Sequence, residues 1–217
     1  MIVDERVSCY IKSLTAYNSD FLEKLREKAL EAKVPIIKRE TESFLKTFLL
    51  LKKPKRILEV GAAVAYSSLV MAETLEGNVK ISTIENYEKR VLEAKKNIAD
   101  SNYSNTIHLI EEDASKVLKE LVEKEEKYDF IFMDAAKGQY INWLEPVIKL
   151  LNKEGVLCSD NVLQGGDIVQ SRYLIERRDR SIHSRLREYL YELTHREELS
   201  TTILSLGDGV ALTVLKK

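Results

Sequence analysis

Short apolar runs alternate with longer amphipathic segments over most of the chain. From residue 56 onward, β-branched and aliphatic runs of strand length are separated by charged segments in which apolar residues recur every three or four positions. This alternation is typical of repeated βα units, in which helices cover a mostly parallel sheet. The sequence therefore predicts an α/β fold.

Five strands of the predicted sheet precede residue 161. They are expected at Arg56–Val60, Lys80–Glu85, Thr106–Ile110, Phe130–Asp134 and Gly155–Asp160. Helices fit between them, most clearly at Glu88–Ala99, Ser115–Lys124 and Tyr140–Leu151. Two further apolar runs, TTILSL and VALTVL, flank the glycine-containing turn at residues 207–209 and predict a hairpin, so we expect the sheet to end with an antiparallel strand.

The first 55 residues read as two helices, roughly Ser19–Ala32 and Glu40–Leu51. They precede the first strand and are expected to cover the cofactor side of the domain or to form a subunit contact. The chain of 217 residues has no repeat and no linker-like segment, so residues 1–217 are predicted to form a single domain.

Composition narrows the class of protein without identifying it. A hydrophobic content of 44% with 32% charged residues is ordinary for a globular protein, and a net charge of −1 gives no global case for nucleic-acid binding. The amino terminus, MIVDERVSCY, carries no signal segment, and no apolar run reaches the length of a membrane span. We expect a cytoplasmic protein with no membrane association.

Two of the predicted strands end in acidic residues. Asp134 follows the apolar run in FIFMDAAKGQY, and Asp160 with Asn161 follows the run in VLCSDNV. The carboxyl ends of neighbouring strands converge on the ligand crevice of an open α/β sheet, so these side chains are expected to meet. Two carboxylates and an amide oxygen suit Mg²⁺ or Mn²⁺ and suit zinc poorly. The alternative for each aspartate alone is that it caps the helix or turn that follows.

A nucleotide-like site is predicted at the end of the first strand. The segment RILEVGAAVAYSS places Glu59, Gly61 and Ser67 at a turn from strand to helix. Gly61 permits a tight turn, and the N-terminus of the following helix can receive a carboxylate or a phosphate. A dinucleotide fingerprint would need further glycines at positions 63 to 65, so the sequence does not favour a nicotinamide or flavin cofactor.

Two more positions extend this site. Glu85 ends the second strand and is placed to accept hydrogen bonds from both ribose hydroxyls, although a solvated glutamate that starts the next helix is the alternative. Asp113 and Ala114 follow the third strand at the equivalent crevice position and are candidates to flank an adenine.

Together these motifs resemble the class I S-adenosylmethionine-dependent O-methyltransferases of the metal-dependent, catechol and caffeoyl-CoA type. The resemblance runs from VPIIKRETESFL through ILEVGAAVAYSS, MDAAKGQY and SDNVLQGG to LGDGVALTV. It implies a Rossmann-like fold, with a mostly parallel seven-stranded sheet, an antiparallel C-terminal strand and helices on both faces. It also implies S-adenosylmethionine as the cofactor and a homodimer. The strings DAAKGQY and DNVLQGG are most similar to bacterial tRNA 5-hydroxyuridine methyltransferases, which methylate a modified uridine at the wobble position, whereas small-molecule members more often carry Asp-Ala-Asp-Lys.

The resemblance assigns roles to individual residues. It implies that Asp134, Asp160 and Asn161 are the metal ligands and that Lys137 lies near the acceptor oxygen, so Lys137 and Asp134 are the predicted catalytic residues. The implied cofactor contacts are Gly61, Ser67, Glu85, Asp113, Ala114 and Asp134, with Glu59 shaping the pocket. The family usually has glycine where Ala65 stands; alanine is compatible with a first helical turn, so we expect a slightly altered pocket.

The predicted chemistry is a direct displacement at the methyl group. A divalent cation would lower the pKa of the acceptor hydroxyl and fix its oxygen, which works best when two adjacent oxygens chelate. Catechol supplies two hydroxyls, and 5-hydroxyuridine supplies its 5-hydroxyl beside the 4-carbonyl oxygen. Lys137 could take the proton or stabilise the oxyanion; the alternative is a surface lysine on a loop.

One segment is locally basic. SRYLIERRDRSIHSRLREYL holds six arginines against three acidic residues, with Tyr173 available for stacking. Such a surface suits the phosphates and unstacked bases of a tRNA anticodon loop. The candidate contacts are Arg172, Arg177, Arg178 and Arg180. A solvated or dimer-forming helix face is the alternative.

Two other functions stay open at this point. An O-methyltransferase for a small catechol-like phenol or a hydroxycinnamoyl thioester would share the same metal and cofactor residues. A non-catalytic protein that binds S-adenosylmethionine or RNA would also keep the fold, but it would not need Asp134, Lys137, Asp160 and Asn161 together.

Overall fold

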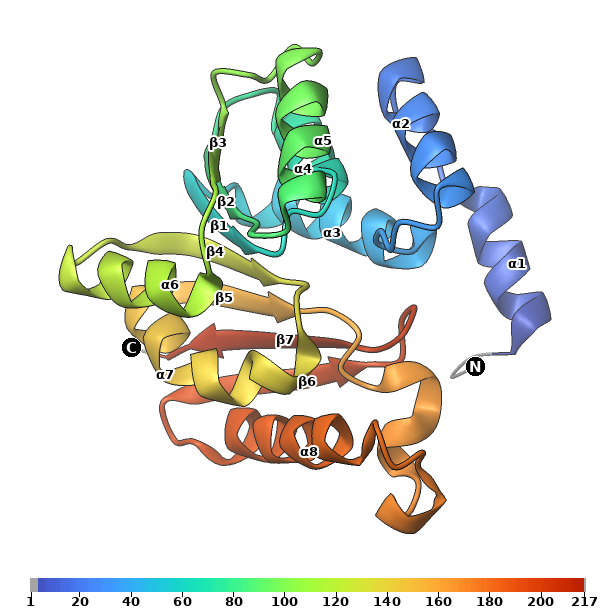
Figure 1. Ribbon diagram of the computed structural model, residues 1–217, viewed down its shortest axis with the longest axis vertical. Coiled ribbons are helices and arrows are strands. Elements are labelled where there is room, and N and C mark those ends of the chain that lie inside the picture. Colours follow the sequence, from blue (N-terminus) through green and yellow to red (C-terminus); the bar gives the residue numbers. More distant parts are fainter. Residues whose placement is uncertain (1–3, 217) are drawn as a thin grey trace.

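A seven-stranded sheet forms the centre of the computed structural model, which describes residues 4–216 (Figure 1). The strand order is β3-β2-β1-β4-β5-β7-β6. Strands β1 to β5 pair in parallel, and β7 is antiparallel to both of its neighbours. The predicted α/β fold with an antiparallel strand at its C-terminal end is therefore confirmed. The strands are β1 Arg56–Val60, β2 Lys80–Ile84, β3 Ile107–Ile110, β4 Tyr128–Met133, β5 Leu151–Ser159, β6 Leu199–Leu204 and β7 Val210–Leu215.

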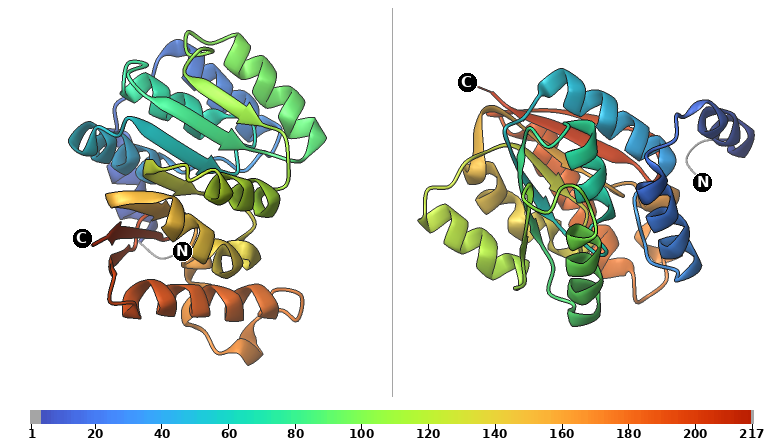
Figure 2. Two further views of the ribbon diagram at one scale, coloured as in Figure 1. Left: turned by 90° about the vertical axis from the view of Figure 1, so that its left-hand side faces the viewer. Right: turned by 90° about the horizontal axis from the view of Figure 1, so that it is seen from above.

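Helices cover both faces of the sheet, as Figure 2 shows in its left-hand view. Alternate strand residues point to opposite faces, so Ile57 and Phe130 pack in one apolar core and Leu58 and Ile131 in the other. The first core includes residues of α2 Asp20–Glu31, α3 Arg39–Lys52, α4 Tyr66–Thr74 and α5 Glu88–Ala99. The second includes residues of α6 Ala114–Glu123, α7 Tyr140–Leu150 and α8 Arg180–His195.

The sequence placed most elements within a few residues of their observed bounds, and β5 differs most. It begins at Leu151, directly after α7, and not at Gly155. Residues 152–154 are polar and carry no apolar alternation, but Leu151 pairs with Tyr128 across an irregularity in the β4–β5 register. Pairing with β4 therefore extends β5 back to Leu151, over residues whose side-chain pattern does not predict a strand.

The amino-terminal region holds three helices, so the expectation of two was wrong. The additional helix, α1 Glu5–Leu14, starts at Asp4, whose side chain accepts a hydrogen bond from the Arg6 N–H. It buries none of its residues and projects from the body of the protein in the right-hand view of Figure 2. Its apolar residues follow helical spacing, and this pattern could have predicted the helix from the sequence. The homodimer contact expected for this region stays a prediction.

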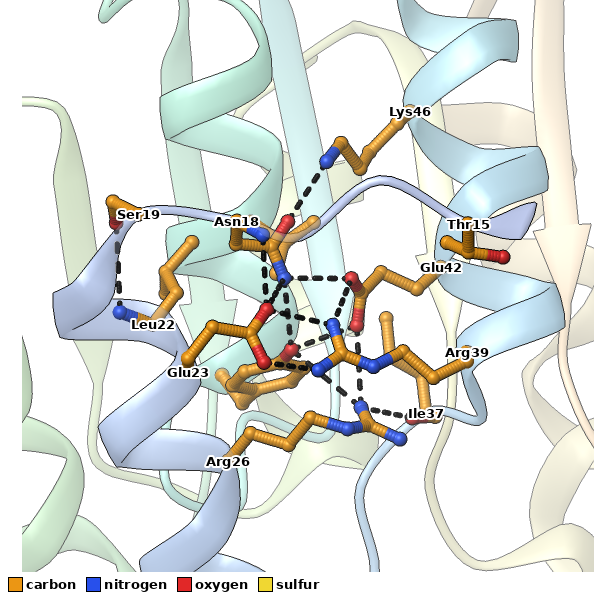
Figure 3. Close-up of polar contacts among 12 residues, drawn as sticks. Thr15, Asn18, Ser19, Leu22, Glu23, Arg26, Ile37, Arg39, Glu42 and Lys46 are labelled. Atoms are coloured by element: carbon orange, nitrogen blue, oxygen red, sulfur yellow. Dashed lines mark hydrogen bonds and ion pairs between the residues drawn. The ribbon is translucent and has the colours of Figure 1, made fainter. Parts of the chain in front are cut away.

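A buried polar network joins α2 and α3 to the first residue of α4 (Figure 3). Glu42 is fully buried and accepts hydrogen bonds from Asn18 Nδ2 at 2.7 Å, Arg39 Nη1 at 3.1 Å and Arg26 Nη1 at 3.2 Å. The hydroxyl of Tyr66 also donates to Glu42 Oε2, at 2.7 Å. The network therefore fixes α2 and α3 against the start of α4, which borders the candidate site.

The described helices include none that could span a bilayer, because within residues 4–216 none combines the necessary length with the necessary apolarity.

Candidate functional site

Polar residues gather where the parallel strands end. The backbone N–H groups of Glu85, Asp134 and Asp160 each continue the hydrogen-bond ladder by one residue: Glu85 N donates to Ile110 O at 3.1 Å, Asp134 N to Val60 O at 3.0 Å and Asp160 N to Met133 O at 3.0 Å. Their side chains therefore leave the sheet at one edge, as the sequence predicted from the strand ends.

A cavity of about 410 Å³ lies along this edge, within the usual size range of small-molecule sites. Five of the predicted cofactor residues line it: Gly61, Glu85, Asp113, Ala114 and Asp134. The sequence prediction missed other lining residues, among them Asn86 and Gln139. Trp143, which the helical stripe of α7 indicated as core or pocket wall, also lines the cavity, and its indole N–H donates to Ser115 Oγ at 3.0 Å.

Gly61 makes the contact that shapes this cavity. Its φ is +102°, and a Cβ at this position would lie 2.2 Å from the main-chain oxygen of Asp134. The backbone segments at Gly61 and Asp134 approach each other so closely that position 61 requires glycine. This close approach also connects the loop after β1 rigidly to the residue after β4.

The conformation expected for Ala65 was wrong. Ala65 is the N-cap of α4, with φ 62° in the left-handed region, and it does not lie in the first helical turn. Ala63 also has a positive φ, 46°. A glycine, which the resembling family usually has at position 65, adopts this conformation without the steric penalty of a Cβ.

Glu85 anchors the same loop. Its Oε2 accepts a hydrogen bond from Ala63 N at 2.8 Å, and its Oε1 accepts from Asn86 N and Tyr87 N, each at 2.9 Å. The carboxylate is thus held in place beside the cavity, and it is not a freely solvated side chain. Oε1 thus accepts two hydrogen bonds and Oε2 accepts one, so Oε2 keeps a lone pair with which it can accept a hydrogen bond from a ligand.

Asp113 serves as a helix cap. Its carboxylate accepts from Ser115 N at 2.9 Å and from Lys116 N at 3.4 Å, at the start of α6. Asp113 and Ala114 also line the cavity, so capping and cavity lining are compatible at this position. Their predicted contact with an adenine stays a prediction.

Glu59 lies in β1 and does not line this cavity. It is fully buried, and Oε2 accepts hydrogen bonds from the hydroxyls of Ser68 and Thr83. Burial raises the pKa of Glu59 to about 7, although the hydroxyls of Ser67, Ser68 and Thr83 oppose the shift. Its side chain links β1 to α4 and β2 through Ser68 and Thr83, and its predicted role in shaping the cofactor pocket stays a prediction.

The candidate metal ligands form an oxygen-rich group. Asp160 is 2% exposed, and its Oδ1 accepts from Asn161 N at 2.8 Å. Burial, and then the negative charge of Asp134, raise the pKa of Asp160 to about 7. The carboxylates of Asp134 and Asp160 repel each other, and the amide of Asn161 follows Asp160 in the chain. A hard divalent cation would compensate this repulsion and prefers such oxygen ligands. No group of three His, Cys, Asp or Glu side chains with metal-binding geometry occurs within residues 4–216. Asn161 stays the predicted third ligand.

Lys137 lies beside these groups in a short 3₁₀ helix, η1 Lys137–Gln139. Its Nζ is 2.8 Å from Asp134 Oδ1, and both side chains are about one-fifth to one-quarter exposed, at 24% and 21%. The lysine therefore points into the site and is not a free surface residue.

A second cavity, of about 310 Å³, opens next to the first. The two cavities share Gly61, Ala63, Asp134 and Ala135 as lining residues. Lys137, Asn161 and the predicted cofactor residue Ser67 line only the second cavity, together with Lys38 and Asp208, which the sequence prediction missed. Two adjacent cavities with the carboxylate of Asp134 at their junction can hold a donor and an acceptor side by side.

The arginine-rich segment follows the metal site in the chain. It leaves β5 at the same edge of the sheet and returns through η3 Arg172–Leu174 to α8 (Figure 1). Tyr173 is 85% exposed and Leu174 is 75% exposed. Arg172 and Arg177 are exposed and form no ion pair with any residue of the described chain, residues 4–216, whereas Arg178 pairs with Glu176 and Asp179. Arg180 is partly buried and donates to the carbonyls of Tyr173 and Ile175.

Comparisons with known proteins bear on the family and the fold of this chain. The model of the O-methyltransferase family matches residues 12–217. A catechol O-methyltransferase of Niastella koreensis is 30% identical over 168 residues, which cover 76% of each chain. Among solved structures, a Staphylococcus aureus protein assigned as a caffeoyl-CoA O-methyltransferase has a TM-score of 0.88 at 30% identity and covers 98% of this chain and 100% of its own. A Podospora anserina methyltransferase with bound S-adenosylhomocysteine has a TM-score of 0.87 at 25% identity and covers 98% of this chain and 95% of its own.

Proposed function

The chain belongs to the O-methyltransferase family, and we propose that it methylates the 5-hydroxyl of 5-hydroxyuridine at the wobble position of tRNA. The protein is an S-adenosylmethionine-dependent O-methyltransferase. The proposal concerns its acceptor, its use of a divalent cation and its tRNA partner. The product would be 5-methoxyuridine.

The first cavity is the proposed place of S-adenosylmethionine. Glu85 lines this cavity and offers the remaining lone pair of Oε2 to a ribose hydroxyl, and the loop around Gly61 gives the ligand close access to the backbone. Asp134 lies where this cavity meets the second one. A methyl group presented there would face the second cavity, which is the proposed place of the acceptor.

Asp134, Asp160 and Asn161 are the residues that would hold Mg²⁺ or Mn²⁺. A bound divalent cation would supply charge that lowers the pKa of the acceptor hydroxyl and a fixed position for its oxygen. Lys137, 2.8 Å from Asp134, is placed to accept the proton of the acceptor hydroxyl or to stabilise the oxyanion. The close contact between Gly61 and Asp134 keeps the donor loop and the acceptor side in a fixed relation, which an in-line displacement needs.

The observation that carries the tRNA proposal is the exposed arginine and aromatic surface beside the acceptor cavity. Arg185 Nη1 donates to Gly138 O at 3.2 Å, so the basic segment packs directly on the turn that carries Lys137. Arg172 and Arg177 are available for phosphates, and Tyr173 is available for a base. The strings DAAKGQY and DNVLQGG, which resemble those of tRNA 5-hydroxyuridine methyltransferases, support the same acceptor.

A small catechol-like or hydroxycinnamoyl thioester acceptor is the second candidate. It is favoured by the relatives named after catechol and caffeoyl-CoA. Both acceptors present two adjacent oxygens, so the same metal and cofactor residues would serve either. In this case the arginine-rich surface would have no role in substrate binding.

The deciding experiment offers both acceptors to the same protein. The purified chain is incubated with S-adenosylmethionine, Mg²⁺ and tRNA that carries 5-hydroxyuridine, and the digested RNA is analysed by mass spectrometry, with a catechol reaction in parallel. We expect 5-methoxyuridine, and we expect chelation or Asp160→Ala to abolish it. Methylated catechol with unchanged tRNA would refute the tRNA proposal and leave the second candidate.

A matched pair of variants tests the tRNA surface. Arg172→Ala and Arg177→Ala should each weaken binding of the tRNA and reduce the slope of its salt dependence by about one. Arg6→Ala is the control, because Arg6 is an equally exposed arginine on α1 but is paired with Asp4. Equal effects of all three variants would show that only the total charge matters.

A further inference from the structure

Asp208 lies in the turn between β6 and β7, 47 residues away in the chain from Asn161, yet the two side chains meet. Asn161 Nδ2 donates to Asp208 Oδ2 at 3.4 Å. The other carboxylate oxygen, Oδ1, accepts from Lys38 Nζ at 2.6 Å. Both Asp208 and Lys38 line the second cavity together with Asn161. The three side chains thus form one polar chain along the wall of the proposed acceptor site.

The turn that carries Asp208 is tightly held. Leu163 N donates to Asp208 O, and Val162 N donates to Gly209 O, each at 3.0 Å. A Cβ on Gly209 would lie 2.3 Å from Leu163 Cγ, and a Cβ on Gly207 would lie 2.6 Å from Thr41 Oγ1. The carboxylate of Asp208 is therefore presented at a defined position, since neighbouring segments fix the backbone on each side of it.

Asn161 needs such a partner to act as a metal ligand. A carboxamide has one oxygen and one NH₂ group, and only its oxygen can bind a cation. An ionised carboxylate only accepts hydrogen bonds, so Asp208 selects the rotamer in which the NH₂ group faces it. The amide oxygen is then left free. The contact of Lys38 Nζ with Oδ1 restrains the Asp208 carboxylate from its other side.

We propose that Asp208 is a positioning residue that orients the Asn161 carboxamide, so that its oxygen and not its nitrogen is offered to the divalent cation. The inference rests on the proposed metal site, and it deepens it by adding a residue that is not itself a metal ligand. Groups that orient metal ligands in this way commonly contribute about 10- to 100-fold to metal affinity.

The test is a double-mutant cycle read by Mn²⁺ binding, with free Mn²⁺ measured by electron paramagnetic resonance on the full chain. In the natural background, Asp208→Ala is expected to weaken Mn²⁺ binding by about 10-fold or more. In the Asn161→Asp background the same substitution should cost little or should strengthen binding. A carboxylate at position 161 has two equivalent oxygens, which leaves no amide to orient, and it would be repelled by Asp208.

The cycle separates orientation from other roles of Asp208. A role in holding the turn, or a general attraction of its charge for the cation, would lower affinity equally in both backgrounds, and that result would overturn the proposal. Asp167→Ala is the control, because Asp167 is an exposed aspartate of the nearby segment 164–169 and bonds only to Gln170 among the described residues. It should leave Mn²⁺ affinity unchanged.

Failure of the metal site itself would look different. If the natural chain did not bind Mn²⁺, or if Asp160→Ala bound it equally well, the proposed metal site would be wrong. If the natural chain bound Mn²⁺ through Asp160 while Asp208→Ala had no effect, only the role of Asp208 would be wrong. Circular dichroism and S-adenosylhomocysteine affinity check that the variants fold, since Asp208 does not line the first cavity.

Discussion

Gly61→Ala is the substitution whose effect the structure defines most sharply. The added Cβ would lie 2.2 Å from Asp134 O, 2.9 Å from Asp134 C and 3.0 Å from the Cβ of Ala135. Two of these atoms belong to the backbone of a central strand end, so no side chain can swing away. The loop after β1, the end of β4 or both must move, and both line the two cavities.

Gly166→Ala is a matched control for backbone strain. Gly166 has φ +108°, close to the +102° of Gly61, and a Cβ there would meet no atom within 4 Å. Both variants place an alanine in a left-handed conformation, which costs about 1–3 kcal/mol. Only Gly61→Ala adds a steric clash, and overpacking of this kind typically costs a further ~1–3 kcal/mol.

The expected difference can be measured in two ways. Thermal unfolding should place the melting temperature of Gly61→Ala about 2–12 °C below that of Gly166→Ala, because 1 kcal/mol shifts a domain of this size by about 2–4 °C. Calorimetric titration should show S-adenosylhomocysteine binding weakened by roughly 5- to 150-fold in Gly61→Ala, if the same 1–3 kcal/mol is expressed in binding. Gly166→Ala should bind as the natural protein does. Equal losses in both variants would refute the reasoning, because strain alone would then explain the need for glycine.

Three further predictions concern single side chains. Glu59→Gln should flatten the dependence of stability on pH, because the raised pKa of Glu59 means that its protonated form is favoured in the folded state. The natural protein should therefore lose roughly 3 kcal/mol in its free energy of unfolding as the pH rises from about 4.5 to about 7. The variant cannot ionise at this position and should not show this loss. Denaturant unfolding at pH 5 and pH 8 measures this, and parallel curves for the two proteins would contradict it. Lys137→Ala should lower kcat by about 100- to 10,000-fold while S-adenosylhomocysteine affinity is retained, because Lys137 does not line the first cavity; a comparable loss of affinity would show that it acts on the cofactor. Glu42→Gln should cost about 3–5 kcal/mol in the free energy of unfolding, because Arg26, 11% exposed, loses its carboxylate partner and Arg39, 18% exposed, keeps only Glu23. Glu93→Gln, in the i,i+3 ion pair with Arg90 in which Glu93 is 37% exposed, should cost less than about 1 kcal/mol. Similar losses in the free energy of unfolding for the two variants would mean that burial of the Glu42 network does not increase its contribution to stability.

The sequence predicted the parts of the site that depend on strand ends. A parallel sheet brings the carboxyl ends of its strands to one edge, so the positions of Glu85, Asp134 and Asp160 after apolar runs were sufficient to group them. The same reasoning could not decide whether Asp113 caps a helix or lines the cavity, because its spacing in the sequence is compatible with either role. In the structure this side chain does both.

Other parts of the site depend on how distant loops fold back. Lys38 and Asp208 are separated by 170 residues and meet only because the turn after β6 packs against the segment before α3. Neither residue lies in a periodic pattern or follows a predicted parallel strand, so the sequence gave no reason to group them. The backbone of Ala65 was likewise hidden, since a left-handed alanine is set by the packing of the loop and not by the preference of the residue.

Asp134 has a position that complicates any simple mutational test of this enzyme. Its main-chain oxygen meets Gly61, its carboxylate pairs with Lys137, its charge raises the pKa of Asp160, and it lines both cavities. A substitution there changes donor binding, cation binding and the acceptor side together, so loss of activity would identify none of them. Glu85 and Lys137 separate the two sides, because Glu85 lines only the first cavity and Lys137 only the second. Glu85→Ala should therefore weaken S-adenosylhomocysteine binding without loss of Mn²⁺ binding. A loss of both would show that the loop anchored by Glu85 also supports the metal ligands.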